Sequence, residues 1–200
     1  MSNIAVIIGN PFADSFSHAL AESYAKAVTK AGSNVRIIDL AQIEFPAVPE
    51  NLNQVRVRGI DHMGELDPAI SHMVKDMEWA EHITFIYPVW WGTYPVALKA
   101  FIDRVFLSGV AFKYGKTGTQ WEKLWSGKTA RLIFTMDAPT WWYKLVYRAP
   151  SENSLRWATL WYVGVKTTGI TRFTPIRFST PEIRAKWLAK SASLGAKDAK

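Results

Sequence analysis

The residues most able to do chemistry lie in one aromatic turn, which spans residues 87–95 and reads YPVWWGTYP. The apolar run at 83–87 is typical of a buried parallel strand, and apolar residues at helical spacing follow over 96–106. Such a turn lies at the carboxyl edge of a parallel sheet, where open α/β folds bind ligands. Two prolines stiffen the turn, and Gly92 lets the backbone approach a flat group. The pattern favours a planar aromatic cofactor over a phosphate or a metal.

Two other loops are expected at the same edge. The first, at 9–17, carries Asn10, Ser15 and Ser17 at a predicted helix start, where free N–H groups and the helix dipole favour phosphate. It has neither the GxGxxG nor the P-loop pattern, so dinucleotide and nucleoside triphosphate sites of those kinds are disfavoured. The other loop, at 136–143, is aromatic. A phosphate at one end and a flat ring at the other describe a flavin nucleotide.

Strands and helices are expected to alternate along the whole chain. The predicted strands are 4–8, 35–40, 83–87, 130–135 and about 173–178; the predicted helices are about 16–31, 68–80, 96–106, 152–162 and 181–192. Residues 41–66 are predicted to be an extended or partly ordered connection, and residues 108–128 an irregular one. Five strands alternating with helices indicate a doubly wound, three-layer α/β fold, and the length indicates a single domain over 1–200.

Composition narrows the class of protein. The chain is 48% hydrophobic, has ten tryptophans and has no cysteine, which excludes disorder, disulfides, cysteine-held metal clusters and thiol catalysis. Residues 1–112 hold 8 basic against 12 acidic side chains (net −4), and residues 113–200 hold 16 against 5 (net +11). The basic residues are scattered, so we expect attraction of a phosphorylated small molecule and no nucleic-acid partner.

Targeting and metal signals are weak. The first residues lack a signal-peptide pattern, and no apolar run is long enough to span a bilayer. We therefore expect a cytoplasmic protein without stable membrane insertion. The four histidines (His18, His62, His72 and His82) lack a convincing ligand spacing, so no metal site is expected.

The segment YPVWWGTYPVALKAFIDRVF at 87–106 resembles the signature of the flavodoxin-like NAD(P)H:quinone oxidoreductases. The resemblance extends to DSFS at 14–17, VAFKY at 110–114 and TPEIR at 180–184. It implies a flavodoxin-like three-layer sandwich with a five-stranded parallel sheet. It also implies a homodimer that binds flavin without a covalent bond and takes NAD(P)H as co-substrate.

The resemblance also assigns roles to individual residues. It implies that the phosphate is held by Asn10, Ser15, Phe16 and Ser17. The wall beside the flavin ring would be formed by Pro88, Val89, Trp90, Trp91 and Gly92. The edge of the pyrimidine ring would be lined by Thr135, Met136 and Asp137. Arg184 matches a residue near the adenosine–phosphate end of the cofactor. Phe112 and Tyr114 match residues that cover the substrate pocket of the neighbouring subunit. Tyr143 and Asp137 are the candidate catalytic residues, and Tyr143 also belongs to the predicted substrate pocket.

The chain departs from the animal relatives in two ways. Asn10 stands where several relatives have histidine, and no histidine follows His82, so the histidine that accompanies the tyrosine in those relatives is missing. Lys144 or Arg148 could balance the charge of a reduced flavin instead.

Plainer interpretations stay open for each residue. The tryptophans could pack in a core, Ser15 and Ser17 could cap a helix, and Asp137 could start a turn. Phe112 and Tyr114 could pack in a dimer interface, Arg184 could form an ion pair, and Tyr143 could be structural.

The expected function is two-electron reduction of quinones, or of azo or nitro compounds, by alternate binding of NAD(P)H and acceptor. The alternatives are a flavodoxin-type electron carrier and a regulatory subunit of a potassium-efflux transporter. FAD is favoured over FMN because the long connections and Arg184 leave room for an adenosine half.

Overall fold

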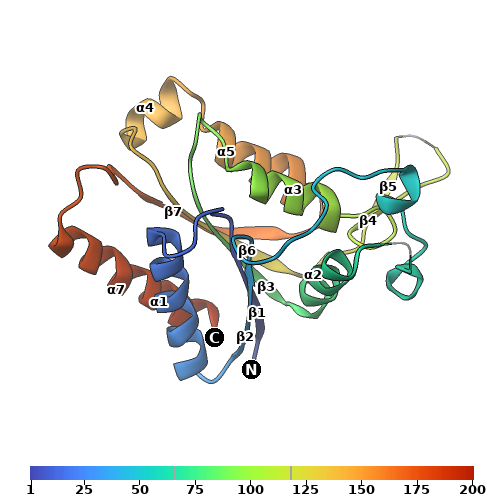
Figure 1. Cartoon of the computed structure of the whole chain (residues 1–200), viewed down its shortest axis with the longest axis horizontal. Helices are drawn as coiled ribbons and strands as arrows, with labels where there is room; N and C mark the ends of the chain where they lie inside the picture. The colour runs from blue at the N-terminus through green and yellow to red at the C-terminus, as the bar shows by residue number, and fades with distance from the viewer. Residues whose placement is uncertain (65, 118) are drawn as a thin grey trace.

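The computed structural model describes residues 1–64, 66–117 and 119–200. Five parallel strands form one sheet in the order β2-β1-β3-β6-β7 (Figure 1). They are β1 (Asn3–Ile8), β2 (Asn34–Asp39), β3 (His82–Pro88), β6 (Thr129–Thr135) and β7 (Lys166–Phe173). The predicted doubly wound α/β sheet is confirmed, while a single domain over 1–200 stays a prediction.

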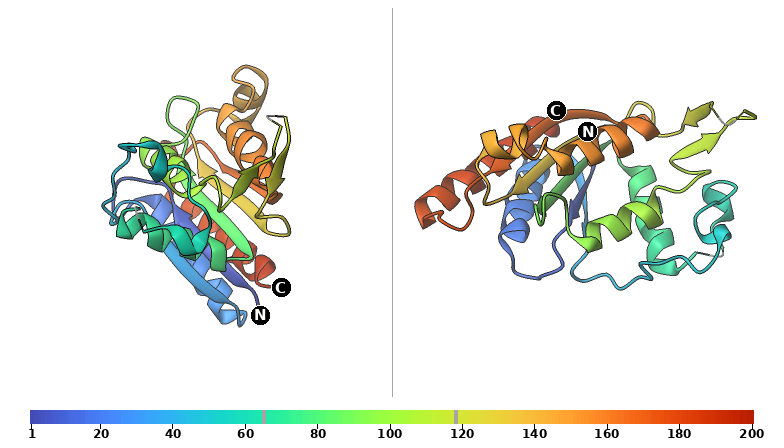
Figure 2. Two further views of the ribbon diagram at one scale, coloured as in Figure 1. Left: turned by 90° about the vertical axis from the view of Figure 1, so that its right-hand side faces the viewer. Right: turned by 90° about the horizontal axis from the view of Figure 1, so that it is seen from above.

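Helices cover both faces of the sheet (Figures 1 and 2). One face holds α1 (Phe16–Lys30) and α7 (Pro181–Asp198); the other holds α2 (Pro68–Trp79), α3 (Val96–Val105) and one continuous helical stretch made of α5 (Pro150–Asn153), the π-helical η3 (Ser154–Leu160) and α6 (Trp161–Val163). The three central strands are buried on both faces, which explains why their sequences are continuous apolar runs.

The helix after β1 follows its sequence pattern closely. Leu20, Tyr24 and Val28 lie three or four residues apart and are buried against the sheet. The helix ends at Lys30, and Gly32 then takes a positive φ of 88°, a conformation that glycine adopts without steric cost.

The last strand was predicted in the wrong place. β7 spans Lys166–Phe173, whereas the sequence suggested 173–178. β7 is an edge strand with mostly half-buried side chains, so it lacks the apolar run that marks the central strands. The chain leaves the sheet after Phe173, and Pro175 has no N–H with which to extend the ladder.

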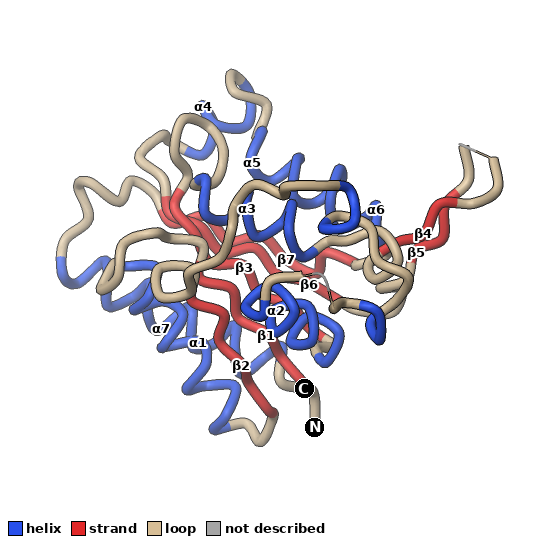
Figure 3. The backbone as a smooth tube through the Cα atoms, turned by 45° about the vertical axis from the view of Figure 1, so that its right-hand side comes forward, coloured by secondary structure: helices blue, strands red, loops and turns tan. Residues whose placement is uncertain are grey.

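The two long connections contain short elements, and the one at 108–128 holds more structure than predicted. Residues 108–128 hold a hairpin of β4 (Phe112–Tyr114) and β5 (Trp121–Lys123), which projects from the body of the molecule (Figure 3). Residues 41–66 include the short 3₁₀ helices η1 (Leu52–Gln54) and η2 (Ile60–His62). A further short helix, α4 (Thr140–Leu145), follows β6.

A buried ion pair joins the last helix to the sheet. Arg131 of β6 donates two hydrogen bonds to the carboxylate of Asp198 at the end of α7, and Tyr24 of α1 donates a third at 2.7 Å. Nε2 of His82 lies 3.3 Å from the same carboxylate. Burial alone would raise the pKa of Asp198, but the hydrogen bonds from Arg131 and the neighbouring His82 outweigh it and lower the pKa.

We expect Asp198→Asn to destabilise the protein by about 3 kcal/mol, because it leaves the buried Arg131 without its counter-charge. Because the folded-state pKa of Asp198 is lowered, its stabilising effect is fully present above the unfolded value of about 3.9 and is lost as the pH falls below it. Urea unfolding from pH 7 down to pH 3 would therefore show wild type and variant converging in stability as the pH falls. A difference in the free energy of unfolding between wild type and variant that stays constant over this pH range would contradict the role assigned to Asp198.

Candidate functional site

The loops after β1, β3 and β6 meet at the carboxyl edge of the sheet, the upper edge in Figure 1. Each loop is tied at its root to the next strand by a backbone hydrogen bond. Gly9 N–H donates to Ile86 (2.8 Å), Val89 N–H to Thr135 (2.8 Å), and Met136 N–H to Phe173 (3.0 Å). The three loops are therefore held at a common height above the sheet.

The aromatic turn is a tight two-residue reversal. Trp90 and Thr93 exchange both backbone hydrogen bonds, at 2.8 and 3.0 Å, and the two residues between them have positive φ, 49° for Trp91 and 80° for Gly92. This is the geometry of a type I′ turn, in which glycine is favoured. The turn projects the whole indole of Trp91 into solvent.

Nearby backbone supports this turn from behind. Ser151 N–H at the start of α5 donates to the carbonyl of Gly92, and the Ser151 hydroxyl donates to the hydroxyl of Tyr87. A Cβ built on Gly92 would lie 3.4 Å from Pro150. Trp91 is thus an exposed ring on a fixed support.

The loop after β1 delivers donors to the start of α1. Asn10 and Ser17 are buried, with the Asn10 amide nitrogen 3.5 Å from the Ser17 hydroxyl. The Asn10 side-chain oxygen accepts from Phe12 N–H, which fixes the loop. Ser15 is the N-cap, but its hydroxyl forms no capping bond to the helix backbone.

Two contacts bring predicted residues of different loops together. The rings of Phe12 and Trp90 lie 5.8 Å apart between centroids, so the first loop touches the aromatic turn. The Arg184 guanidinium lies 5.6 Å from the ring centre of Phe16 and donates to the Ser179 hydroxyl. Arg184 therefore lies beside the start of α1, although the two are far apart along the chain.

The loop after β6 is held by contacts with the aromatic turn and with the turn at 174–179. Thr135 and Met136 are buried at the end of β6, and the Thr135 carbonyl accepts from the aromatic turn. The Asp137 carboxylate accepts from the backbone N–H of Arg177 at 2.8 Å and lies 3.4 Å from the Arg177 side chain. Asp137 therefore anchors the turn at 174–179, which is distant along the chain.

Tyr143, the candidate catalytic tyrosine, points into the core. It is 1% exposed, its ring lies 5.9 Å from that of Phe134, and its hydroxyl accepts from the backbone N–H of Glu152. Burial raises the pKa of Tyr143, so the hydroxyl stays protonated. In this position Tyr143 supports the loop and does not reach the solvent side of the site.

His18, for which no metal role is expected from the sequence, lies beside the start of α1. Nδ1 of His18 is 2.8 Å from the Ser15 hydroxyl, and Nε2 is 3.0 Å from the Asp39 carboxylate. These side chains border a hollow of about 570 Å³ beside the start of α1. Asp39 at the end of β2 thereby fixes His18, and His18 fixes Ser15.

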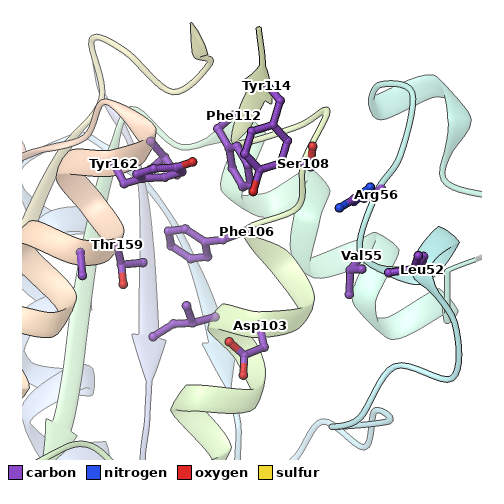
Figure 4. Close-up of a pocket in the computed structure, with 13 residues that line it drawn as sticks. Leu52, Val55, Arg56, Asp103, Phe106, Ser108, Phe112, Tyr114, Thr159 and Tyr162 are labelled. Carbon is purple, nitrogen blue, oxygen red and sulfur yellow. The ribbon is translucent and has the colours of Figure 1, made fainter. Parts of the chain in front are cut away.

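Phe112 and Tyr114 lie away from these loops. They sit on the β4 strand, where the ring centroids of Phe112 and Tyr162 are 5.1 Å apart (Figure 4). With Phe106, Arg56 and other residues they line a separate hollow of about 380 Å³. Within one chain, the predicted pocket residues therefore fall at two places.

The donor set at the carboxyl edge fits a flavin nucleotide. The first turn of α1 has no acidic residue, and the hydroxyls of Ser15 and Ser17 and the amide of Asn10 lie there, next to His18, which Asp39 holds. Backbone amides of a first turn have no acceptor within their helix, so they too are free to donate to a phosphate. The exposed indole of Trp91 and the Phe12–Trp90 pair supply flat apolar surface for a ring.

Three supporting residues were missed by sequence reasoning. Arg172 of β7 pairs with the buried Glu152 at 2.5 Å, next to Ser151 at the start of α5. No local pattern marks these residues, because they meet only when β7 lies beside β6.

Over the described ranges, no helix has the length and apolar content to cross a membrane, and no group of three or more His, Asp or Glu side chains could hold a metal.

Comparison with known proteins gives one family and several distant relatives. A family model described as "Flavodoxin-like fold" matches residues 2–194. The chain is 24% identical to a ribosyldihydronicotinamide dehydrogenase-like protein, traD, of Penicillium crustosum over 66% of this chain, and 24% identical to NAD(P)H dehydrogenase [quinone] 1 of Cavia porcellus over 92%. It spans 57% of the length of the first relative and 72% of the second.

A solved structure shares the fold over the whole chain. It is an FMN-dependent NADH-azoreductase from Bacillus anthracis, in complex with FMN, with a TM-score of 0.77, 17% identity and 100% coverage of both chains. At this identity the likeness concerns the fold.

The junction after α4 gives a test of backbone strain. Arg148 has a φ of 60°, a left-handed conformation that is unfavourable for arginine. We expect Arg148→Gly to raise stability by about 1 kcal/mol, read as a higher Tm. As a control, Arg156→Gly lies inside η3 and should lower stability by about 1 kcal/mol. A lower Tm for Arg148→Gly would show that the arginine side chain matters more than the strain.

Proposed function

The chain belongs to the family of proteins with the flavodoxin-like fold, and from this premise we propose that it is an NAD(P)H-dependent flavin oxidoreductase. Its acceptors are quinones, or azo or nitro compounds. One observation carries the proposal: the first turn of α1, which has no acidic residue, and an exposed indole on a fixed turn lie at one edge of the sheet, joined by the Phe12–Trp90 contact. The names of the curated relatives support the same class of reaction.

Each loop at the carboxyl edge binds a different part of the cofactor. Ser15, Ser17 and Asn10 hold the phosphate with the first amides of α1. Pro88, Val89 and the turn from Trp90 to Gly92 form the wall of the ring, and Thr135, Met136 and Asp137 border its edge. When bound, a flavin supplies hydride acceptance from NAD(P)H and two-electron transfer to an acceptor.

The protein's own contribution is positioning. Trp91 and its support keep a flat apolar wall in place, which orients a ring and excludes water from one side of it. In the overall reaction NAD(P)H gives up a hydride, a proton is taken from solvent, and a quinone becomes a hydroquinone. Lys144 and Arg148 are exposed on and just after α4, and they add positive charge to the side of the molecule on which negative charge would develop.

Tyr143 has a positioning role in this proposal. Its hydroxyl and that of Tyr87 are bonded to the start of α5, which in turn holds Gly92. Asp137 similarly fixes the turn that leads to Arg184. Neither side chain has to gain or lose a proton for this role.

FAD is the proposed flavin, with FMN as the alternative. The support is Arg184, which adds a cation next to Phe16 beyond the donors that a single phosphate needs. The hollow of about 570 Å³ beside Ser15 leaves room for further groups. Heating the purified protein and measuring the mass of the released flavin decides between the two.

A homodimer accounts for Phe112 and Tyr114. They lie at the hairpin, away from the aromatic turn, so a single chain does not bring them to its own site (Figure 1). In a two-fold pair of chains, the hairpin of one subunit covers the turn of the other. A cytoplasmic location completes the proposal.

The activity is tested on purified protein. We expect a yellow protein that bleaches when NADH or NADPH is added without oxygen and regains its colour with a soluble quinone. A protein that binds flavin but oxidises neither nicotinamide without a partner reductase would be an electron carrier, and this would overturn the proposal.

The aromatic turn gives a sharper test. Trp91→Asn keeps the positive φ of this position, since asparagine suits a type I′ turn, but removes the ring. We expect an unchanged or higher Tm and about two- to tenfold weaker flavin binding, because an aromatic contact contributes about 0.5–1.5 kcal/mol. Trp91→Phe is the control and should bind nearly as wild type. Equal flavin affinity for the asparagine variant would remove Trp91 from the site.

The phosphate end is tested with a matched ligand pair. We expect Ser15→Ala to weaken the binding of FMN by about tenfold, because a hydrogen bond to a charged group contributes about 1.5 kcal/mol. Binding of riboflavin, which lacks the phosphate, should be unchanged. Fluorescence titration measures both, and an equal loss for the two ligands would place Ser15 away from the phosphate.

A further inference from the structure

The segment from α4 to α5 presents an unusual outer surface. Within residues 141–148, Tyr143 alone turns inward, while Trp141, Trp142, Leu145, Val146 and Tyr147 are exposed. Leu145 is 75% exposed and Trp141 is 60% exposed, so these are outward-facing side chains and not the edge of the core. Figure 1 shows α4 projecting from the body of the molecule. We call this set of five apolar side chains the α4 ridge.

Two cationic side chains lie among those of the α4 ridge. Lys144 and Arg148 are exposed within the segment, and residues 139–150 include no acidic residue. The chain from 113 to 200 carries a net charge of +11, so the ridge lies in the basic half. Its surface thus combines bulky apolar groups with cations.

A further exposed aromatic side chain lies on a turn that is held to the residues preceding the ridge. Phe178 is 76% exposed and follows Arg177, which is bound to Asp137. The same turn is held by Ile176 N–H on the Met136 carbonyl and by the Thr174 hydroxyl on the Ala138 carbonyl. Both segments therefore project from residues 136–138 and keep a fixed relation to the site.

These features favour a lipid surface over a protein partner. Tryptophan and tyrosine, with an apolar ring and a polar edge, gather where a bilayer meets water, and cations next to them are drawn to anionic headgroups. Protein interfaces are also rich in tryptophan, tyrosine and arginine but are depleted in lysine, so the exposed Lys144 and the positive charge without acidic partners favour an anionic lipid surface. The ridge is too short to span a bilayer, so it would lie in the interface without insertion of a helix across it.

We propose that the α4 ridge docks this protein on anionic lipid bilayers. The ridge begins directly after the loop that borders the candidate site. The buried Tyr143 fixes which face of α4 points to the solvent. Docking therefore holds the site at the headgroup level, next to the hydrocarbon core in which long-tailed apolar quinones are dissolved. This last point, the choice of a membrane-dissolved acceptor, rests on the proposed function; the docking does not.

The test is sedimentation of the flavin-loaded protein with vesicles. We expect binding to vesicles that contain phosphatidylserine, weaker binding to pure phosphatidylcholine, and a blue shift of the tryptophan emission on binding. Trp141→Ser combined with Leu145→Ser should weaken vesicle binding by about tenfold or more, because each removes a bulky apolar side chain. Lys144→Gln with Arg148→Asn should remove most of the preference for the anionic lipid.

The control is Val48→Ser, since Val48 is 75% exposed in the connection at 41–66 and should not affect vesicle binding. The Trp141/Leu145 variant should still bind flavin and should reduce a short, water-soluble quinone as wild type does. Wild-type protein that stays in solution with both kinds of vesicle would overturn the docking. So would a change of the Trp141/Leu145 variant from dimer to monomer in size-exclusion chromatography, since a second copy would then cover the ridge.

The two proposals fail separately. Vesicle binding without NAD(P)H oxidation would contradict the proposed function and leave the docking intact. Oxidation of NAD(P)H with no vesicle binding would contradict only the docking. If the protein binds vesicles but reduces a long-tailed quinone in them no faster than the Trp141/Leu145 variant, the membrane-dissolved acceptor is wrong.

Discussion

The site depends on a hydrogen-bond ladder that continues one residue beyond the strands. Gly9, Val89 and Met136 each donate to the neighbouring strand as the chain leaves the sheet, so three loops start from one level. A Cβ on Gly9 would lie 2.8 Å from Leu98 and 3.1 Å from Tyr87, which requires a residue without a side chain at this close approach. Because the five strands of the main sheet are parallel, this level coincides with its carboxyl edge, where residues distant in sequence can meet one ligand.

Rigidity at the edge comes from buried groups behind it. The Gly92 carbonyl is held by Ser151, and Glu152 beside it is paired with Arg172. The tyrosines that join this network stay protonated, because burial raises the pKa of both Tyr87 and Tyr143. An exposed indole at Trp91 is compatible with such support, since the turn keeps its shape without help from the ring itself.

The segment after β6 has two functional faces. Its inner side, through Tyr143, supports the edge of the sheet, and its outer side carries the α4 ridge. The proposed cofactor site and the proposed lipid-docking surface therefore share one short helix. If both proposals hold, this arrangement brings the site to a bilayer without a separate domain for membrane contact.

The sequence by itself determined the parallel sheet, since continuous apolar runs at β1, β3 and β6 reflect burial on both faces. It also located the aromatic turn and the α1 start, because proline, glycine and hydroxyl side chains encode local geometry. It misplaced β7, whose half-buried edge position gives no strong pattern. Only the tertiary structure decided that Tyr143 points inward, that Asp137 holds Arg177, and that His18 joins Ser15 to Asp39. These contacts link residues from different elements, and the direction of a side chain on a short helix depends on what packs against it rather than on the order of residues along the chain.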